Sequence, residues 1–278
     1  MKHIINLEAA VETHVGLVRE SNEDNFYFDG EISDSVKTPC AGLAFTKKSG
    51  RYLFAVCDGM GGMNSGEKAS CIAAGAIKQL KEFSDPDFKT INKFIGALND
   101  KIYYEASDVE DKGMGTTLAA LVIKDGYAFA LNVGDSRAYH MRGGKLTLIT
   151  EDHTQAQRLI KMRILTESEA KNHYSRHLLS RYLGMAPEEG EVSAHFSQVI
   201  EINKGDSFLI ASDGLTEMLE EEMVEKIMQK KGSASECAKR LVKEAIASGG
   251  RDNITVIVLK INNIAAYEQP EEIIIHEG

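Results

Sequence analysis

Carboxylate side chains stand at the ends of several apolar, strand-like runs of this sequence, each beside a glycine or an asparagine. These residues are Glu23, Asp24, Asp58, Asp213 and Asp252. At any one position the pattern has an ordinary structural explanation, because Asp-Gly and Asp-Asn pairs form turns readily. Its repetition at four separate strand ends favours a second interpretation, in which the carboxylates gather at one place in the fold.

Carboxylates gathered in this way would repel each other strongly inside a protein, which raises their pKa values or destabilises the fold. Divalent cations resolve that conflict, and an oxygen-only ligand set selects Mg²⁺ or Mn²⁺ over zinc. No histidine pair has a spacing suited to zinc. The neighbouring glycines let the backbone approach closely and offer a carbonyl oxygen as a further ligand. The pattern therefore predicts a magnesium or manganese centre.

An arginine precedes the first acidic pair by four residues, in Arg19-Glu20-Ser21-Asn22-Glu23-Asp24. A guanidinium group can bind phosphate through two parallel hydrogen bonds. Arg19 is therefore a candidate phosphate ligand. The structural alternative is a surface ion pair between Arg19 and a nearby carboxylate, and the residues alone leave both interpretations open.

The elements that would position these groups follow from hydrophobic periodicity. Apolar or β-branched runs predict strands over residues 13–18, 51–57, 116–123, 127–133, 138–141, 145–149, 192–202, 207–211 and 254–261. Lys124-Asp125-Gly126 predicts a hairpin between two of these runs. Apolar residues at helical spacing predict helices over residues 69–83, 91–102, 223–228 and 234–245. Because long helices come in pairs between groups of strands, we expect packed sheets with helices outside them.

The chain shows no internal repeat and no linker, which favours one domain over residues 1–262. Residues 151–184 differ from the rest, because they are polar and carry only short helical patterns. Long excursions of this kind are often functional. Residues 263–278 form a C-terminal tail, for which an extra strand and a loose segment are both open.

Composition limits the partners. The 278 residues carry a formal net charge of −10, which argues against nucleic acid and anionic membranes as partners, because both attract clustered Lys and Arg. No apolar run approaches the ~20 residues that span a bilayer, and the N-terminus does not resemble a signal peptide. Cys40, Cys57, Cys71 and Cys237 have no zinc-type spacing, so we expect buried structural thiols. These features predict a cytoplasmic protein, which we expect to be a monomer.

The order of the motifs resembles that of the metal-dependent protein phosphatases, the PPM or type 2C class, and most closely its bacterial branch. The resemblance covers almost the whole chain and combines individually weak motifs into a specific set. The motifs are Arg19-x-x-Asn22-Glu23-Asp24, Asp58-Gly59-Met60-Gly61-Gly62, Gly113-Met114-Gly115-Thr116-Thr117, Gly134-Asp135-Ser136-Arg137, Thr150-Glu151-Asp152-His153, Ser212-Asp213-Gly214 and Arg251-Asp252-Asn253-Ile254-Thr255.

This resemblance implies an α+β fold, a four-layer α-β-β-α sandwich of two antiparallel β-sheets flanked by pairs of helices, with two Mn²⁺ or Mg²⁺ ions at one end. Asp58 would bridge the two ions. Glu23 and the Gly59 carbonyl would hold one of them, and Asp213 and Asp252 the other. Asp24 would support the cluster through a hydrogen bond to a metal-bound water, Arg19 would bind the substrate phosphate, and residues 151–184 would match the flap beside the active site.

Two positions depart from the family pattern. Animal members carry a histidine after the Asp-Gly pair that is thought to act as a general acid, and this chain has Met60 there. A metal-bound water or another residue would then protonate the leaving oxygen. The resemblance also places an aspartate, a ligand for a third ion, two residues before the glycine of Gly-Thr-Thr. Gly113 occupies that position, so the sequence leaves a third ion open.

The implied activity is hydrolysis of phosphoserine and phosphothreonine in proteins, the substrates of Ser/Thr kinases, by direct attack of a metal-bridging hydroxide. Two other functions stay open: a binding module that senses phosphoproteins without turnover, and an enzyme for a small phosphate ester. A cysteine phosphatase is disfavoured, because the residue six after Cys57 is Met63 rather than the arginine of a phosphate-cradling loop.

Overall fold

The computed structural model describes residues 2–32, 40–61, 65–81, 87–106 and 113–267. Its strands are β1 (Lys2–His14), β2 (Asn25–Phe28), β3 (Glu31–Ile32), β4 (Cys40–Ser49), β5 (Arg51–Cys57), β6 (Gly59–Met60), β7 (Gly115–Thr116), β8 (Leu118–Lys124), β9 (Tyr127–Val133), β10 (Arg137–Arg142), β11 (Lys145–Leu148), β12 (His195–Phe196), β13 (Ile200–Glu201), β14 (Ser207–Ala211) and β15 (Ile254–Tyr267). Its helices are α1 (Ser65–Ile77), α2 (Phe88–Glu105), α3 (Gln155–Lys161), α4 (Glu167–Ala170), α5 (Asp213–Thr216), α6 (Glu221–Met228) and α7 (Ala234–Ala247). Short 3₁₀ turns are η1 (Lys78–Lys81), η2 (Tyr174–His177) and η3 (Pro187–Glu189).

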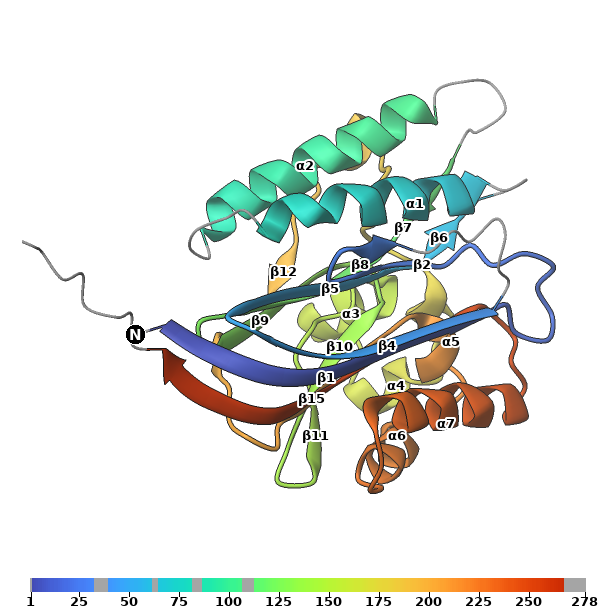
Figure 1. Cartoon of the computed structure of the whole chain (residues 1–278). Coiled ribbons are helices and arrows are strands. Elements are labelled where there is room, and N and C mark those ends of the chain that lie inside the picture. Colours follow the sequence, from blue (N-terminus) through green and yellow to red (C-terminus); the bar gives the residue numbers. More distant parts are fainter. Residues whose placement is uncertain (1, 33–39, 62–64, 82–86, 107–112, 268–278) are drawn as a thin grey trace, which may run out of the picture.

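Two antiparallel sheets form the centre of the molecule. One has the order β11-β10-β14-β15-β1-β4, and the other has the order β12-β9-β8-β5-β2-β3, with β13 also paired to β9. Helices α1 and α2 lie outside the second sheet, and α6 and α7 lie outside the first (Figure 1). This arrangement confirms the predicted α-β-β-α sandwich.

Alternation of side chains along the strands builds the core between the layers. In β5, Leu53 packs on the α1 and α2 side, whereas the next residue, Phe54, packs between the two sheets. In β15, Ile257 lies between the sheets and Val258 faces α7. Successive residues of a strand point to opposite faces of the sheet, so strands buried on both sides read as continuous apolar runs. These strands therefore have well-defined positions, and so do the residues at their ends.

The hairpin predicted at Lys124-Asp125-Gly126 is present. Strands β8 and β9 pair in antiparallel register with Lys124 opposite Tyr127. Asp125 (φ 50°) and Gly126 (φ 90°) occupy the turn. Positive φ at both central residues is what a two-residue turn of type I′ requires, and Asp-Gly is one of the pairs that adopt it.

The structure differs from the predicted strands at several places. The strand predicted over residues 13–18 is β1, which ends at His14, and Leu17 and Val18 are exposed. The single strand predicted over 192–202 is replaced by the short β12 and β13. Strand β4 was not predicted, because its residues do not alternate regularly between apolar and polar. It lies at the edge of the sheet and pairs there with β1.

The C-terminal boundary also differs from the prediction. Strand β15 continues past residue 262, and Asn263 pairs with Asn6 and Tyr267 with Lys2. The first part of the predicted tail is therefore an extension of the sheet, and residues 268–278 lie outside the described residues. Residues 151–184 contain only the short helices α3, α4 and η2, in agreement with the predicted pattern. Among the described residues, no helix is long and apolar enough to span a membrane.

Candidate metal centre

The predicted carboxylates meet at one end of the two sheets. Asp58 follows β5 in one sheet, Asp213 follows β14 in the other, and Asp252 stands two residues before β15. In antiparallel neighbours the end of one strand lies beside the start of the next, so β14 and β15 bring Asp213 and Asp252 to the same edge. The sandwich then places Asp58 opposite them.

Asp58 lies in the middle of this cluster. Its side chain is partly exposed, and its carboxyl group lies within hydrogen-bonding reach of that of Asp213. Burial, followed by the charges of Asp213, Asp24 and Asp135, raises the pKa of Asp58 well above its usual range. Burial also raises the pKa of Asp213 to about 7, helped by the charges of Glu217 and Asp252. Carboxyl groups that raise each other's pKa in this way form a site where a divalent cation can take the place of a proton.

Asp24 is buried behind this pair, with an exposed fraction of 1%. Its Oδ2 accepts a hydrogen bond from Ser212 Oγ at 2.8 Å, whereas its buried Oδ1 has no hydrogen-bond partner among the described residues. Burial raises the pKa of Asp24 to about 7, although the hydrogen bond from Ser212 opposes the shift. An unpaired buried carboxylate oxygen is costly, and a hydrated cation would satisfy it.

Glu23 and Gly59 lie on the other side of Asp58. A Cβ atom at Gly59 would come within 2.5 Å of the Glu23 carbonyl oxygen and 2.2 Å of the Gly66 carbonyl oxygen, so only glycine fits. The Glu23 carboxylate lies against the start of α1, where Oε2 is 2.6 Å from the position of a Cβ at Gly66. Ser70 Oγ fixes the same segment by donating to the Glu23 carbonyl oxygen at 2.6 Å.

Arg19 lies at the exposed rim of the cluster. Its Nη2 donates to Asp252 Oδ2 at 2.6 Å, and 55% of the Arg19 side chain is exposed. The charges of Glu23 and Asp58 also raise the pKa of Arg19, after the hydrogen bond and charge of Asp252. The ion pair that was the structural alternative for Arg19 is present, and it places the guanidinium group within the carboxylate cluster.

Asn253 holds the loop that carries these residues. Its Oδ1 accepts from the Glu23 backbone N–H at 2.8 Å, and its Nδ2 donates to the carbonyl oxygens of Val15 and Ser21, both at 2.9 Å. One amide side chain next to Asp252 therefore ties the segment that contains Arg19 and Glu23 to the start of β15.

The Gly-Thr-Thr motif holds the Asp58 backbone in place through hydrogen bonds. Thr117 Oγ1 accepts a hydrogen bond from the Asp58 backbone N–H at 3.0 Å, and the Asp58 carbonyl oxygen accepts from Thr117 N–H at 2.8 Å and from Thr116 Oγ1 at 2.9 Å. Thr117 Oγ1 also pairs with Ser136 Oγ at 2.6 Å. The hydroxyl of Thr117 thus connects the ends of β5 and β9.

Asp135 belongs to the cluster, and the sequence analysis did not include it among the candidate ligands. It is half-buried, and burial and the charges of Asp213 and Asp152 raise its pKa, although Arg137 opposes the shift. The signal was present, because Asp135 follows the apolar strand β9 and a glycine, as Asp58 follows β5. By contrast, Gly113 has φ 87° and open space around its Cα.

A second acid, Asp152, is held beside Asp135. Arg137 donates two parallel hydrogen bonds to it, from Nε to Oδ1 at 2.9 Å and from Nη2 to Oδ2 at 2.6 Å. This bidentate geometry fixes both side chains. The charge of Asp152 is therefore offset by Arg137, whereas Asp135 has no such partner in the described part of the chain.

The residues of the cluster fit hard divalent cations. Every side-chain donor is a carboxylate oxygen, the donor type that Mg²⁺ and Mn²⁺ prefer. In the described part of the chain, no three His, Cys, Asp or Glu side chains are arranged as a finished metal site. The contacts explain this, because Asp252 is turned to Arg19 and Asp58 to Asp213. The unpaired Asp24 Oδ1 and the close approach of the Asp58 and Asp213 carboxyl groups are both features that a cation would resolve.

The cysteines take no part in this cluster. Cys57 is buried next to Asp58, and burial followed by the nearby carboxylates raises the pKa of its thiol, which disfavours a thiolate nucleophile. Cys237 is buried in the α7 core, as predicted. Cys71 is exposed, so the prediction of a buried thiol is wrong there, and the Cys40 side chain lies outside the described residues.

Comparisons with known proteins place this geometry among phosphatases. The profile of the family described as protein phosphatase 2C matches residues 13–254. The serine/threonine phosphatase stp of Listeria welshimeri is 33% identical over 269 residues, which are 92% of this chain and 96% of the relative. The crystal structure of the Mycobacterium tuberculosis serine/threonine phosphatase PstP/Ppp is 31% identical, covers 93% of this chain and 100% of that chain, and has a TM-score of 0.77. A structure of the catalytic domain of PstP in complex with two manganese ions is 31% identical, covers 94% of this chain and 100% of that chain, and has a TM-score of 0.73.

Proposed function

The chain belongs to the protein phosphatase 2C family, and from this membership we propose how its own residues perform the reaction. It is a metal-dependent serine/threonine protein phosphatase, with Mn²⁺ or Mg²⁺ as cofactor, and it acts on phosphorylated proteins. The proposal assigns the metal ligands, the phosphate ligand and the setting in which the protein works.

Asp58 is the proposed bridge between two ions. Its position supports this role, because it interacts with three other carboxylates, Asp213, Asp24 and Asp135. Glu23 and the Gly59 carbonyl, which are packed against each other and α1, would hold one ion. Asp213 and Asp252, which β14 and β15 bring together, would hold the other. Asp24, with its unpaired Oδ1, would accept a hydrogen bond from a metal-bound water.

Asp135 extends this ligand set. Its carboxyl group interacts with that of Asp213, so these two side chains are the pair available to a third ion. The acid that the family pattern led us to look for at Gly113 is therefore not required at that position. Asp152 is a poorer candidate, because Arg137 already occupies both of its oxygens.

Arg19 is the proposed ligand of the substrate phosphate. Its guanidinium group is more than half exposed, so an incoming phosphoryl group can reach it. With Asp252 held by a cation, the guanidinium would be able to exchange that carboxylate for phosphoryl oxygens, to which it can donate two parallel hydrogen bonds. Bound cations supply the remaining chemistry, since they lower the pKa of water toward neutrality and offset charge on the phosphoryl oxygens.

The setting is proposed from the sequence and the cysteines. The buried cysteines Cys57 and Cys237 are free thiols, as is usual in the reducing cytoplasm. We place the protein there as a monomer that reverses the action of Ser/Thr kinases. Light scattering of the purified protein at micromolar concentration, with a mass near the 30.5 kDa of one chain, would support the monomer.

The close approach of the Asp58 and Asp213 carboxyl groups, which lie within hydrogen-bonding reach of each other, carries this proposal. The test is release of phosphate from phosphothreonine, phosphoserine and phosphotyrosine peptides in the presence of Mn²⁺, Mg²⁺ or chelator. We expect turnover of the first two substrates with either metal and none with chelator, and Asp213→Asn should remove it. A steep preference for small phosphate esters would contradict the protein-phosphatase assignment. Lack of metal-dependent turnover on every substrate would indicate a binding module.

A further inference from the structure

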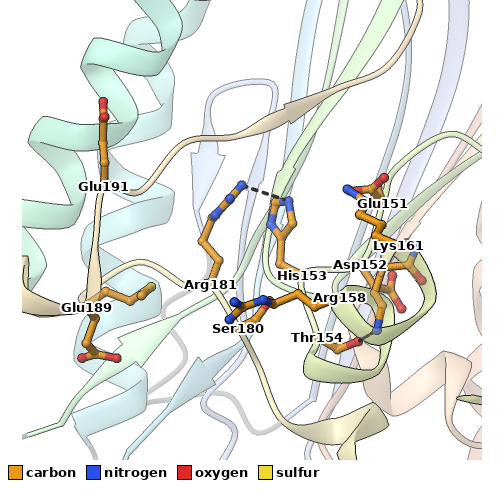
Figure 2. Close-up of a pocket in the computed structure, with 12 residues that line it drawn as sticks. Glu151, Asp152, His153, Thr154, Arg158, Lys161, Ser180, Arg181, Glu189 and Glu191 are labelled. Carbon is orange, nitrogen blue, oxygen red and sulfur yellow. Dashed lines mark hydrogen bonds and ion pairs between the residues drawn. The ribbon is translucent and has the colours of Figure 1, made fainter. Parts of the chain in front are cut away.

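A cavity of about 370 Å³ lies next to the metal centre, between α3 and the segment that follows η2. Residues 151–154, Gln157, Arg158 and Lys161 line one side of it, and Ser180, Arg181, Met185, Glu189 and Glu191 line the rest (Figure 2). Asp152 connects the two sites, because it lines the cavity and its charge also acts on Asp135 of the carboxylate cluster. A substrate chain bound at the metal centre therefore passes close to this cavity.

Most charges of the wall nearest α3 are already paired. Lys161 Nζ lies 2.5 Å from Glu151 Oε1, and Asp152 is held by Arg137. Arg158 has no ion-pair partner among the residues that the structure describes. Arg181 Nη1 donates to the carbonyl oxygen of Ser193 at 2.9 Å, which leaves its charge without a carboxylate. Two guanidinium groups therefore remain available to an anion.

Among the described residues, the carboxylates of the opposite wall form no ion pair with the guanidinium groups of Arg158 and Arg181. Glu189 and Glu191 lie on the other side of the cavity from Lys161 and Glu151 (Figure 2). Glu189 Oε1 accepts a hydrogen bond from the Ala186 backbone N–H at 3.3 Å, which turns it toward its own 3₁₀ turn. The cavity is thus basic on one wall and acidic on the other.

His153 adds a buried donor to the basic wall. It is 7% exposed, and its Nδ1 accepts a hydrogen bond from the Gly134 backbone N–H at 3.1 Å, so Nδ1 carries no proton. Burial, followed by the charge of Arg181, lowers the pKa of His153 to about 4, so the ring is neutral at pH 7. The single ring proton of this neutral imidazole is then on Nε2.

This tautomer creates an unsatisfied pair of donors. His153 Nε2 lies 3.3 Å from Arg181 Nη1, and both atoms carry protons (Figure 2). Guanidinium has no acceptor, and the Gly134 bond has already used the acceptor nitrogen of His153. Two donors that face each other in a partly buried site need an oxygen acceptor that both can reach.

We propose that this cavity is a second oxyanion subsite, in which His153 Nε2, Arg181 and Arg158 bind another phosphoryl group of a multiply phosphorylated protein substrate. A phosphoryl group offers three acceptor oxygens and up to two negative charges, which matches one imidazole N–H and two guanidinium groups better than a carboxylate does. The inference rests on the proposed function, because it assigns the cavity to the chain that carries the scissile phosphate.

Phosphate binding without metal tests the subsite separately from catalysis. Inorganic phosphate is titrated into the full chain in chelator, and the His153 imidazole resonances are followed by NMR. We expect a saturable change in the His153 chemical shift. Arg181→Gln should raise the dissociation constant for phosphate about ten- to hundred-fold, which corresponds to the loss of one charge-assisted hydrogen bond. Arg158→Gln, an exposed position that tolerates substitution, should weaken it less. Arg163→Gln removes a charge from the same segment outside the cavity and should change nothing.

Peptide kinetics identify the source of the oxyanion. Phosphothreonine peptides with and without a second phosphothreonine, placed at a range of spacings, are compared with Mn²⁺ present. We expect a higher kcat/KM for the doubly phosphorylated series at a defined spacing, and loss of that preference in Arg181→Gln but not in Arg163→Gln.

Two results would overturn the inference while leaving the phosphatase assignment intact. One is an imidazole signal of His153 that phosphate does not move. The other is a wild-type protein that shows no preference for doubly phosphorylated peptides, or a preference that is the same in Arg181→Gln as in Arg163→Gln. Loss of all turnover by the wild type would instead contradict the proposed function, whatever the phosphate titration shows.

Discussion

At the scale of single residues, Arg19 and Asp252 show how a structural contact and a functional role coexist. The ion pair between them, 2.6 Å long, holds the guanidinium group at the rim while 55% of its side chain stays exposed. Such a pair adds little stability at the surface, since exposed ion pairs contribute about 0–1 kcal/mol. Its value is therefore positional, because it keeps a phosphate-binding group beside the carboxylates.

This leads to a kinetic prediction for Arg19→Ala. The substitution removes bidentate contacts to the substrate phosphate, which we expect to raise KM about ten-fold or more with a smaller change in kcat. Arg19→Lys, which keeps the charge but not the fork, should recover part of the loss. An equal fall of kcat and kcat/KM, with KM unchanged, would argue against a substrate-binding role.

The residues of the cluster could largely be predicted from the sequence, because each acid follows or precedes an apolar strand. Glu23, Asp24, Asp58, Asp213 and Asp252 all reach one place in the structure. Asp135 obeys the same rule, although it was not among the predicted ligands. Pairing was not predictable: which oxygen of Asp24 lacks a partner, or which carboxyl groups approach each other, depends on contacts between segments far apart in the chain.

At the scale of elements, the strand ends are fixed to one another through Thr117. Its hydroxyl accepts from the Asp58 backbone and pairs with Ser136, so it joins the ends of β5 and β9. The Asp58 carboxylate is thereby oriented by a group that touches no metal. Positioning of this kind usually affects metal affinity as much as stability.

Thr117→Val tests this role. The exchange keeps the shape but leaves a buried N–H unpaired, so we expect a loss of about 1–3 kcal/mol in the free energy of unfolding and a roughly 10–100-fold weaker affinity for Mn²⁺. High Mn²⁺ should restore most of the phosphatase rate. Thr147→Val, at an exposed position of β11, is the matched control. A Thr117→Val protein with normal Mn²⁺ affinity would show that the hydroxyl does not position Asp58.

Element positions were predictable where patterns were long and unambiguous. The strands β5, β9 and β14 agree with the predicted ranges because they are buried on both faces. The start of β1 was not predicted, although Ile5 and Leu7 of its core face alternate with Asn6 and Glu8 on the other face. Its end was misplaced because Gly16 turns the chain, with φ 85° and no room for a Cβ against the Asp252 carbonyl oxygen.

At the scale of the whole molecule, the two ends of the sandwich differ in how their acidic side chains are paired. The metal end gathers several carboxylates whose charges raise one another's pKa values, whereas the buried acid just before β14, Asp206, is paired with basic side chains. Arg142 Nη2 lies 2.6 Å from Asp206 Oδ2, and His140 Nε2 lies 3.3 Å from it. Burial would raise the pKa of Asp206, but the hydrogen bond from Arg142 and the neighbouring His140 outweigh it and lower the pKa.

The paired acid predicts a pH dependence of stability. A carboxyl group with a lowered pKa in the folded state stabilises the fold fully above its unfolded pKa of about 3.9, and loses that contribution as the pH falls through the folded value. Asp206→Asn should therefore lower the free energy of unfolding at pH 7 by about 1–3 kcal/mol, and denaturant titrations should show the difference narrowing below about pH 4. A difference that is independent of pH would contradict this assignment. Asp206 lies at the far end of β14 from Asp213, so the activity per folded molecule should not change.

The central claim is that the carboxylate cluster around Asp58 holds the metal ions that drive hydrolysis. Its most direct test is a Mn²⁺ titration of metal-free protein, with phosphate release from a phosphothreonine peptide measured at each step. For the wild type we expect the rate to rise with the occupancy of at least two Mn²⁺ ions. Asp58→Asn should fold normally and stay inactive, with a loss on the order of 10³-fold or more, at Mn²⁺ concentrations that saturate the wild type. Full activity of the wild type in chelator, or near-normal rates for Asp58→Asn, would contradict the account.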